Sequence, residues 1–431
     1  RSIESDDFTE DVYLYITDNN GNASNMYSAR FTFNRYAGNV PVMPVNLASS
    51  DITTSSFTLS WDAVDEATAY KIYRNSSYYL TVGSETTSAS ITSLSSGTSY
   101  NMQVAAVNNS GAGEKSGTLA VSTEQELAGH SFEETVNVGK APWGLAVEAN
   151  DNYLYVTNWA SGTLSIIQRS DHTIAKTISV GLNPSGIAAE PGGQYVYVTN
   201  SAVNDSTVSV IEISSNTVDK TITVGNRPRG IAAEPTGTYV YVTRLSADRV
   251  TVIEVATNTV DSEIDVGDGP DGITAVLGQL FVYSANSYED TVSVISTVTN
   301  TVSETITVGN GPRAMAAHPA GSYVYAANWY DDTVSVIDTV TNSVLTTVQV
   351  GNGPQALAAT HEHVYTANYF DDTVSVIRIS DNTVVRTINL NGTSQGSGHF
   401  GPRSIAVDSS GDNLYIANHN MDNVSVFQIE P

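Results

Sequence analysis

The stretch Leu154–Ile167, LYVTNWASGTLSII, sets the pattern for most of the chain. It reads as a strand with alternating apolar residues, an asparagine, a short turn and the start of a second strand. Because variants of it recur at a nearly fixed interval, the chain is expected to contain strand units that repeat in space. The seven copies are YVTN at Tyr155, YVTN at Tyr197, YVTR at Tyr241, YSAN at Tyr283, YAAN at Tyr325, YTAN at Tyr365 and YIAN at Tyr415.

Prolines mark the same seven units, with successive spacings of 42, 44, 42, 42, 42 and 48 residues. Four strands are expected in each unit: a small apolar strand after the proline, the tyrosine motif, a TVSVI-like strand and an NTVSETITVG-like strand. Small side chains suit an innermost strand, since only they fit around a central axis. The pattern therefore predicts an all-β, seven-bladed propeller over residues 130–431. The prolines are Pro142, Pro184, Pro228, Pro270, Pro312, Pro354 and Pro402.

These motifs resemble the YVTN-type β-propeller repeats of surface-layer and cell-surface proteins, including the trailing DTVSVID and TNTV wording. The resemblance implies the propeller fold and a place at the cell surface. It implies no particular activity, because propellers carry many functions and the site has to be argued from its own residues.

The ends of the repeat predict how the ring closes. The seventh unit stops at NVSVFQIEP and has no residues for a fourth strand, whereas EETVNVG, from Glu133 to Gly139, has fourth-strand wording and precedes the first unit. We expect Thr135–Val138 to pair with the strand around Val424–Gln428, so that the two ends of the propeller share one blade.

Residues 1–39 alternate apolar and polar positions on both sides of Asp18–Asn22, which predicts a hairpin with an Asn/Gly turn. Two strands alone bury little apolar surface, so we interpret them as the final hairpin of an immunoglobulin-like domain with its other strands upstream. The Asp/Asn-rich turn lacks a bidentate acidic ligand at calcium-binding spacing. No cofactor is expected, and a structural calcium ion is not indicated.

Residues 40–126 change to short strands separated by Ser/Thr/Gly turns. TLSWDAV with Trp61, AYKIYRN with Tyr70, and LSSGTSYNMQVAAVN with Tyr100 resemble a fibronectin type III module. The expected features are a buried tryptophan and a tyrosine whose hydroxyl ties a crossover corner to its strand. Such a module is expected to act as a spacer or a weak binder.

Composition limits the functions available to the chain. It carries 45 acidic and 18 basic residues, a formal charge of −27 and no cysteine. An acidic chain lacks the basic footprint for nucleic acid, and thiol chemistry is excluded. No apolar run approaches the roughly 18 residues of a membrane span. Tandem β modules with this composition favour an extracellular or cell-surface protein. Six N-x-Ser/Thr sequons begin at Asn22, Asn75, Asn108, Asn204, Asn391 and Asn423.

One face of the predicted propeller gathers the proline turns and the loops that follow each Asn motif. The residues after the prolines, expected at the channel mouth, are Trp143, Ser185, Arg229, Asp271, Arg313, Gln355 and Arg403. Arginine forks suit carboxylates, and aromatic faces suit sugar rings or cations. We therefore expect an acidic glycan or a carboxylate-bearing protein partner here. The candidate ligand-binding residues are Trp143, Arg229, Arg244, Arg313, Trp329, Tyr369 and Arg403.

A structural alternative and an enzymatic one stay open for this face. In the first, Asp271 forms a salt-bridged ring with Arg229 and Arg313, and the aromatic side chains pack between blades. In the second, His399, His419 and Tyr369 supply the base and acid of a polysaccharide lyase acting on uronates.

Paired acids such as Asp331-Asp332 and Asp371-Asp372 recur at one repeat position, which indicates a turn preference rather than glycosidase chemistry. The prediction is thus a binding, adhesion or self-assembling surface protein.

Overall fold

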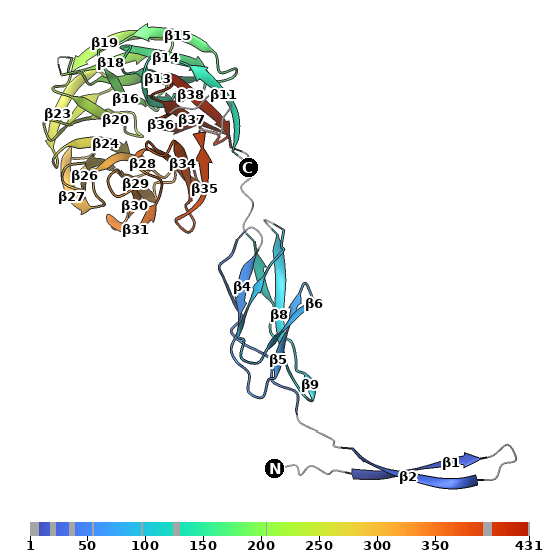
Figure 1. Cartoon of the computed structure of the whole chain (residues 1–431). Helices are drawn as coiled ribbons and strands as arrows, with labels where there is room; N and C mark the ends of the chain where they lie inside the picture. Colours follow the sequence, from blue (N-terminus) through green and yellow to red (C-terminus); the bar gives the residue numbers. More distant parts are fainter. Residues whose placement is uncertain are drawn as a thin grey trace. The chain divides into compact units, whose positions relative to one another are not determined.

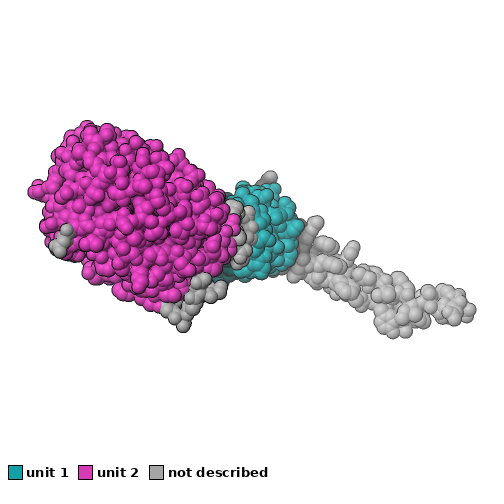
Figure 2. Space-filling view, turned by 90° about the horizontal axis from the view of Figure 1, so that it is seen from above, with its two compact units in different colours: residues 1–127 teal, residues 128–431 magenta. Residues whose placement is uncertain are grey.

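The computed structural model describes residues 8–17, 23–33, 39–53, 56–95, 98–123, 130–203, 205–390 and 399–429. The chain divides into two compact units, Arg1–Leu127 and Ala128–Pro431, which Figure 2 colours separately. Each unit is built from strands. The described ranges contain no apolar helix of membrane-spanning length.

The first unit begins with the predicted hairpin. Strand β1 (Phe8–Thr17) pairs antiparallel with β2 (Ala23–Phe33), with Phe8 opposite Phe33. The turn at Asp18–Asn22, considered above for calcium, lies outside the described residues. Membership of an immunoglobulin-like domain stays a prediction.

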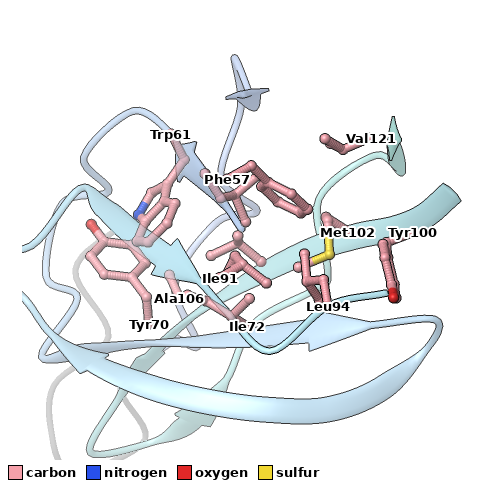
Figure 3. Packing of buried hydrophobic residues seen from close by; sticks show 12 residues of the cluster. Phe57, Trp61, Tyr70, Ile72, Ile91, Leu94, Tyr100, Met102, Ala106 and Val121 are labelled. Atoms are coloured by element: carbon pink, nitrogen blue, oxygen red, sulfur yellow. The ribbon is translucent and has the colours of Figure 1, made fainter. Parts of the chain in front are cut away.

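Two sheets packed face to face form the rest of this unit. One has the order β10-β8-β5-β6 with β9 paired to β8, and the other has the order β3-β4-β7. Between them lies an apolar core (Figure 3) in which Trp61 packs against Tyr70 with ring centroids 5.4 Å apart. The Tyr100 hydroxyl accepts a hydrogen bond from the Ser95 N–H at 2.9 Å, so the predicted tyrosine corner is present. The strands are β3 (Ala48–Ser50), β4 (Phe57–Ser60), β5 (Ala69–Arg74), β6 (Ser77–Gly83), β7 (Ser88–Ile91), β8 (Ser99–Asn108), β9 (Gly111–Ala112) and β10 (Leu119–Ser122).

The second unit is a ring of seven four-stranded antiparallel sheets, as predicted (Figure 1). We number the blades one to seven in the order of their prolines. The innermost strand of each blade begins at the proline, where the missing N–H costs no ladder hydrogen bond. These strands are β12 (Pro142–Val147), β16 (Pro184–Ala189), β20 (Pro228–Ala233), β24 (Pro270–Ala275), β28 (Pro312–Ala317), β32 (Pro354–Ala359) and β36 (Pro402–Val407).

The tyrosine motif forms the second strand, and the two outer strands follow it. Second strands are β13 (Tyr153–Asn158), β17 (Tyr195–Asn200), β21 (Tyr239–Arg244), β25 (Phe281–Asn286), β29 (Tyr323–Asn328), β33 (His363–Asn368) and β37 (Asn413–Asn418). Third strands are β14 (Thr163–Gln168), β18 (Thr207–Glu212), β22 (Arg249–Glu254), β26 (Thr291–Ser296), β30 (Thr333–Asp338), β34 (Thr373–Arg378) and β38 (Asn423–Gln428). Fourth strands are β15 (Ile174–Ser179), β19 (Thr217–Thr223), β23 (Thr259–Asp265), β27 (Thr301–Thr307), β31 (Ser343–Gln349), β35 (Thr383–Asn389) and β11 (Ser131–Asn137).

The ring closes as the sequence predicted. Blade seven has the order β11-β38-β37-β36, so its outermost strand comes from the start of the propeller. Thr135 lies opposite Ser425, and Val136 lies opposite Val424. Val136 is 6% exposed and belongs to a cluster with Val424.

Hydrogen bonds between side chains tie most blades to the next, whereas the Tyr325 hydroxyl of blade five has no such partner in the described ranges. The buried tyrosine hydroxyl of one blade donates to an asparagine in the turn between the third and fourth strands of the following blade. Tyr197 donates to Asn258 at 2.6 Å, and three other tyrosines make the same bond. The closure replaces this asparagine: Tyr365 bonds to His130 at 3.2 Å, and Tyr415 accepts from Arg169 at 3.0 Å.

The motif asparagine joins the second strand of its blade to the third. It is fully buried, and its amide bridges to side-chain hydroxyls on the third strand. Asn328 donates to Thr333 at 3.0 Å and to Ser335 at 2.9 Å. A Cβ built on Gly309 would lie 2.5 Å from the Asn328 Nδ2, so glycine before the proline turn makes room for this amide.

Candidate functional site

The channel mouth is a cavity of about 220 Å³, lined by the innermost strands of all seven blades. All seven residues that follow the prolines line it, where the repeat geometry placed them. They include three arginines and one aspartate, which leaves a formal excess of two positive charges in a chain whose net charge is −27. The mouth is therefore the place on this acidic protein where an anion is favoured.

Arg403 is the most constrained of these cations. Its guanidinium carbon lies 3.3 Å from the centroid of a Trp143 ring, and its Nε is buried without a hydrogen-bond partner among the described residues. Burial, followed by the charge of Arg229, lowers the pKa of Arg403 to about 9. A partly buried guanidinium lacking a carboxylate partner favours an anionic ligand that would supply one.

The other two arginines of the mouth have different partners. The Arg229 Nε lies 3.3 Å from an Asp271 carboxylate oxygen, and its guanidinium also lies 4.8 Å from the Trp143 ring. Arg313 lies over Trp329 at 4.1 Å and forms no ion pair within the part of the chain described. The alternative of a salt-bridged ring is thus realised at one of its two contacts, Arg229–Asp271.

The aromatic candidates cluster beside Arg313 and Arg403. The Trp329 and Tyr369 ring centroids are 5.9 Å apart, and Arg403 lies 5.7 Å from the Tyr369 ring. Because arginines cover a face of Trp143 and of Trp329, these indoles hold the guanidinium groups in place. Of these aromatic side chains, Trp143 lines the mouth, whereas Trp329 and Tyr369 pack beside its arginines.

Arg244 lies at the same end of its blade as the proline turn, opposite Pro228, but outside the mouth. It occupies the asparagine position of blade three and does not line the mouth. Its guanidinium pairs with Glu263 at 2.5 Å on the outermost strand, and Arg249 holds the same carboxylate at 2.7 Å. The long side chain extends outward along the blade instead of bridging hydroxyls as the asparagine does.

The three residues considered for lyase chemistry do not form one group. His399 Nδ1 lies 2.8 Å from an Asp372 oxygen, and its ring meets the Tyr369 ring edge at 5.1 Å. His419 instead packs against Trp143 at 5.5 Å, with Nδ1 3.3 Å from the Pro142 carbonyl oxygen. Burial, and then Arg403, lower the pKa of His419. The sequence pattern does not predict Asp372 as the partner of His399. The Gly/Ser-rich stretch 391–398 before His399 lies outside the described residues.

Paired acids in the loops hold the blades together. Asp331 accepts hydrogen bonds from the backbone and side-chain nitrogens of Asn310 in its own blade. The neighbouring Asp332 accepts the Gly353 N–H of the next blade at 2.8 Å. The interpretation of these pairs as turn residues thus has a structural reason. Within the described ranges, no three potential His, Asp or Glu ligands gather as a metal site.

A seven-bladed propeller with a charged mouth, preceded by a fibronectin type III domain over residues 42–122, is the class that this fold and site define. The family model described as "Lactonase, 7-bladed beta-propeller" matches residues 172–265 and 279–431. The chain belongs to this family.

A search among curated proteins found no match. Among solved structures, the chain is similar to hydrazine synthase of Kuenenia stuttgartiensis, with 17% identity and a TM-score of 0.58. That similarity covers 69% of this chain and 99% of the other, and at this identity it shows the fold alone.

Proposed function

We propose that the protein is an extracellular, cell-surface binding protein whose propeller mouth receives the carboxylate of an acidic glycan or of a protein partner. The proposal rests on Arg403, a partly buried cation without a carboxylate partner in the described ranges, which lies beside Arg229 and Arg313. A planar guanidinium pairs with a carboxylate through two parallel hydrogen bonds. Such a ligand would provide the negative charge that balances the arginines of the mouth.

Cell-surface placement and adhesion or self-assembly are supported by the chain's architecture. The fibronectin type III module and the acidic, cysteine-free composition suit a protein that works outside the cell. Of the sequons, Asn423 is 4% exposed and unsuited to glycosylation, whereas Asn75 is exposed. Asn22, Asn204 and Asn391 lie outside the described residues.

Calorimetric titration with polygalacturonate and with its methyl ester tests the mouth. The acidic polymer is expected to bind and the neutral ester is not. The double variant Arg229→Ala with Arg313→Ala and the single variant Arg403→Ala are expected to lose binding. Lys220→Ala, on the outermost strand β19, is the matched charge-removal control and is expected to bind as the wild type does. Equal binding of the ester, or unchanged binding by Arg403→Ala, would contradict the proposal.

A second function, polysaccharide lyase, is favoured by one specific contact. Asp372 is positioned to orient His399 as a base, and Tyr369 lies against that histidine. Incubation with polygalacturonate, alginate and glycosaminoglycans, followed at the ultraviolet band of unsaturated uronates, tests it with His399→Ala as the matched variant. Because the family name refers to lactone hydrolysis, lactones belong in the same assay. Turnover lost in His399→Ala would establish an enzyme, and absence of turnover would leave the binding function alone.

A further inference from the structure

A second cavity of about 370 Å³ opens beside the mouth, over blades one to three. We call it the side pocket. Trp143 and Arg229 line both cavities, so the side pocket lies directly beside the mouth. The side pocket is also lined by Trp159, Asn183, Ser201 and Arg227.

The repeat is broken where this pocket forms. In blade one the motif Asn158 is five residues from its partner Thr163, whereas in blade two Asn200 is seven residues from Thr207. The two extra residues explain the 44-residue proline spacing of this blade. The longer loop brings Ala202 and Val203 to the pocket wall, although Val203 stays 71% exposed. A recognition loop on a rigid scaffold commonly arises from such an insertion.

Two pocket residues also adopt a backbone conformation that favours glycine. The residue before each innermost-strand proline has a positive φ, and blades four to seven place glycine there. Blades two and three instead have Asn183, with φ 52°, and Arg227, with φ 50°. Positive φ is unfavourable for arginine, and such residues gather at functional sites. The backbone thus carries two polar side chains into the pocket at positions that elsewhere have none.

The loop residue that packs against this position also differs between the blades. In blades four to six a ring packs directly on the glycine; a Cβ on Gly311 would lie 2.4 Å from Tyr330 Cδ2. The residues equivalent to Tyr330 in blades one and two are the small Ala160 and Ala202. Small residues there leave the space that the side pocket occupies.

The chemistry of the side pocket suits an acidic sugar. The Trp143 and Trp159 rings stack with centroids 5.8 Å apart and form an aromatic wall. The Arg227 side chain makes no hydrogen bond or ion pair within the described part of the chain, and the residue lines the cavity. An aromatic wall takes the apolar face of a pyranose ring, and a guanidinium without a partner takes a carboxylate.

We propose that the side pocket binds one unit of an acidic oligosaccharide, a hexuronate, while the carboxylate of the neighbouring unit enters the mouth. The inference rests on the proposed function for the identity of the ligand. It adds that the ligand is an oligomer that binds at two adjacent sites. Arg227 holds the carboxylate of the outer unit, and Trp159 contacts its ring.

The test compares galacturonic acid with its dimer and trimer by calorimetry. In the wild type, affinity is expected to rise at least tenfold from monomer to dimer, because a second charge-assisted contact is added. Arg227→Ala is expected to lose that gain while binding the monomer as the wild type does. Trp159→Ala should weaken the dimer likewise, with Trp61→Phe in the fibronectin module as an aromatic control. Retained melting temperatures show that the variants are folded.

The outcomes separate the two proposals. Monomer binding that depends on Arg403, with no gain for the dimer, overturns the side pocket and leaves the mouth standing. Dimer binding that depends on Arg227 but not on Arg403 supports the side pocket and overturns the mouth. A dimer that binds Arg227→Ala as tightly as the wild type also overturns the side pocket, and no uronate binding at any length overturns both.

Discussion

Replacing single tyrosines by phenylalanine measures the bonds that join the blades. In Tyr197→Phe the buried hydroxyl that donates to Asn258 at 2.6 Å is lost, and the Asn258 oxygen, in a residue 6% exposed, keeps no such donor. The lost bond costs about 1 kcal/mol, and a buried polar group left unsatisfied costs about 1–3 kcal/mol. Because the cost of the unsatisfied oxygen already contains that of the lost bond, we expect a loss of about 1–3 kcal/mol in the free energy of unfolding.

Tyr325 provides the matched control, because its hydroxyl is buried without a hydrogen-bond partner among the described residues. Tyr325→Phe removes the same atom at the equivalent position of another blade and should be neutral or slightly stabilising. Calorimetry of the whole chain measures both variants, and the fibronectin transition serves as an internal reference that neither should move. Equal losses in the two variants would show that the cost comes from removing the hydroxyl atom itself and not from the hydrogen bond to Asn258.

Three further predictions concern closure, protonation and packing. Deleting Phe132–Val138 should lower the melting temperature of the propeller, since burial of Val136 alone contributes about 1.5–3 kcal/mol; an unchanged transition would contradict the closing register. Burial, followed by the charges of Arg386 and His363, lowers the pKa of His130 to about 4 from its ordinary 6.5. His130 thus contributes stability above pH 6.5 that is lost as the pH falls toward 4, because the unfolded chain takes up the proton first. Over this pH range, the free energy of unfolding measured with urea should fall less steeply for His130→Gln than for the wild type. Parallel profiles for the two proteins would contradict the prediction. Gly309→Ala should cost about 1–3 kcal/mol by overpacking, measured by the same method, and a neutral result would show that the Asn328 amide moves freely.

The sequence predicts the blades, the closing strand and the ring of residues at the mouth. It does so because these follow from periodicity and from the order of strands, which local patterns carry. Position in a repeat unit is enough to place Arg229, Arg313 and Arg403 together, although 174 residues separate the first from the last.

The remaining features depend on contacts between blades, which no local pattern records. Asn258 receives the Tyr197 hydroxyl from 61 residues away, and the sequence marks it only as a turn residue. Arg244 sits at a motif position, yet its partner Glu263 is on another strand and draws it outward. The 44-residue proline spacing is a sequence signal for the longer loop beside the side pocket. It does not by itself predict a cavity, because that also depends on the small residues that line it.

The closing register also determines how the ring responds to mechanical force. Ser131, at the start of β11, lies opposite Gln428, at the end of β38. Tension applied between these two ends therefore pulls on the same end of an antiparallel pair and separates its hydrogen bonds one at a time, like a zipper. Load that enters at Ser131 and leaves through the innermost strands also passes first along β11, so the same seam bears it.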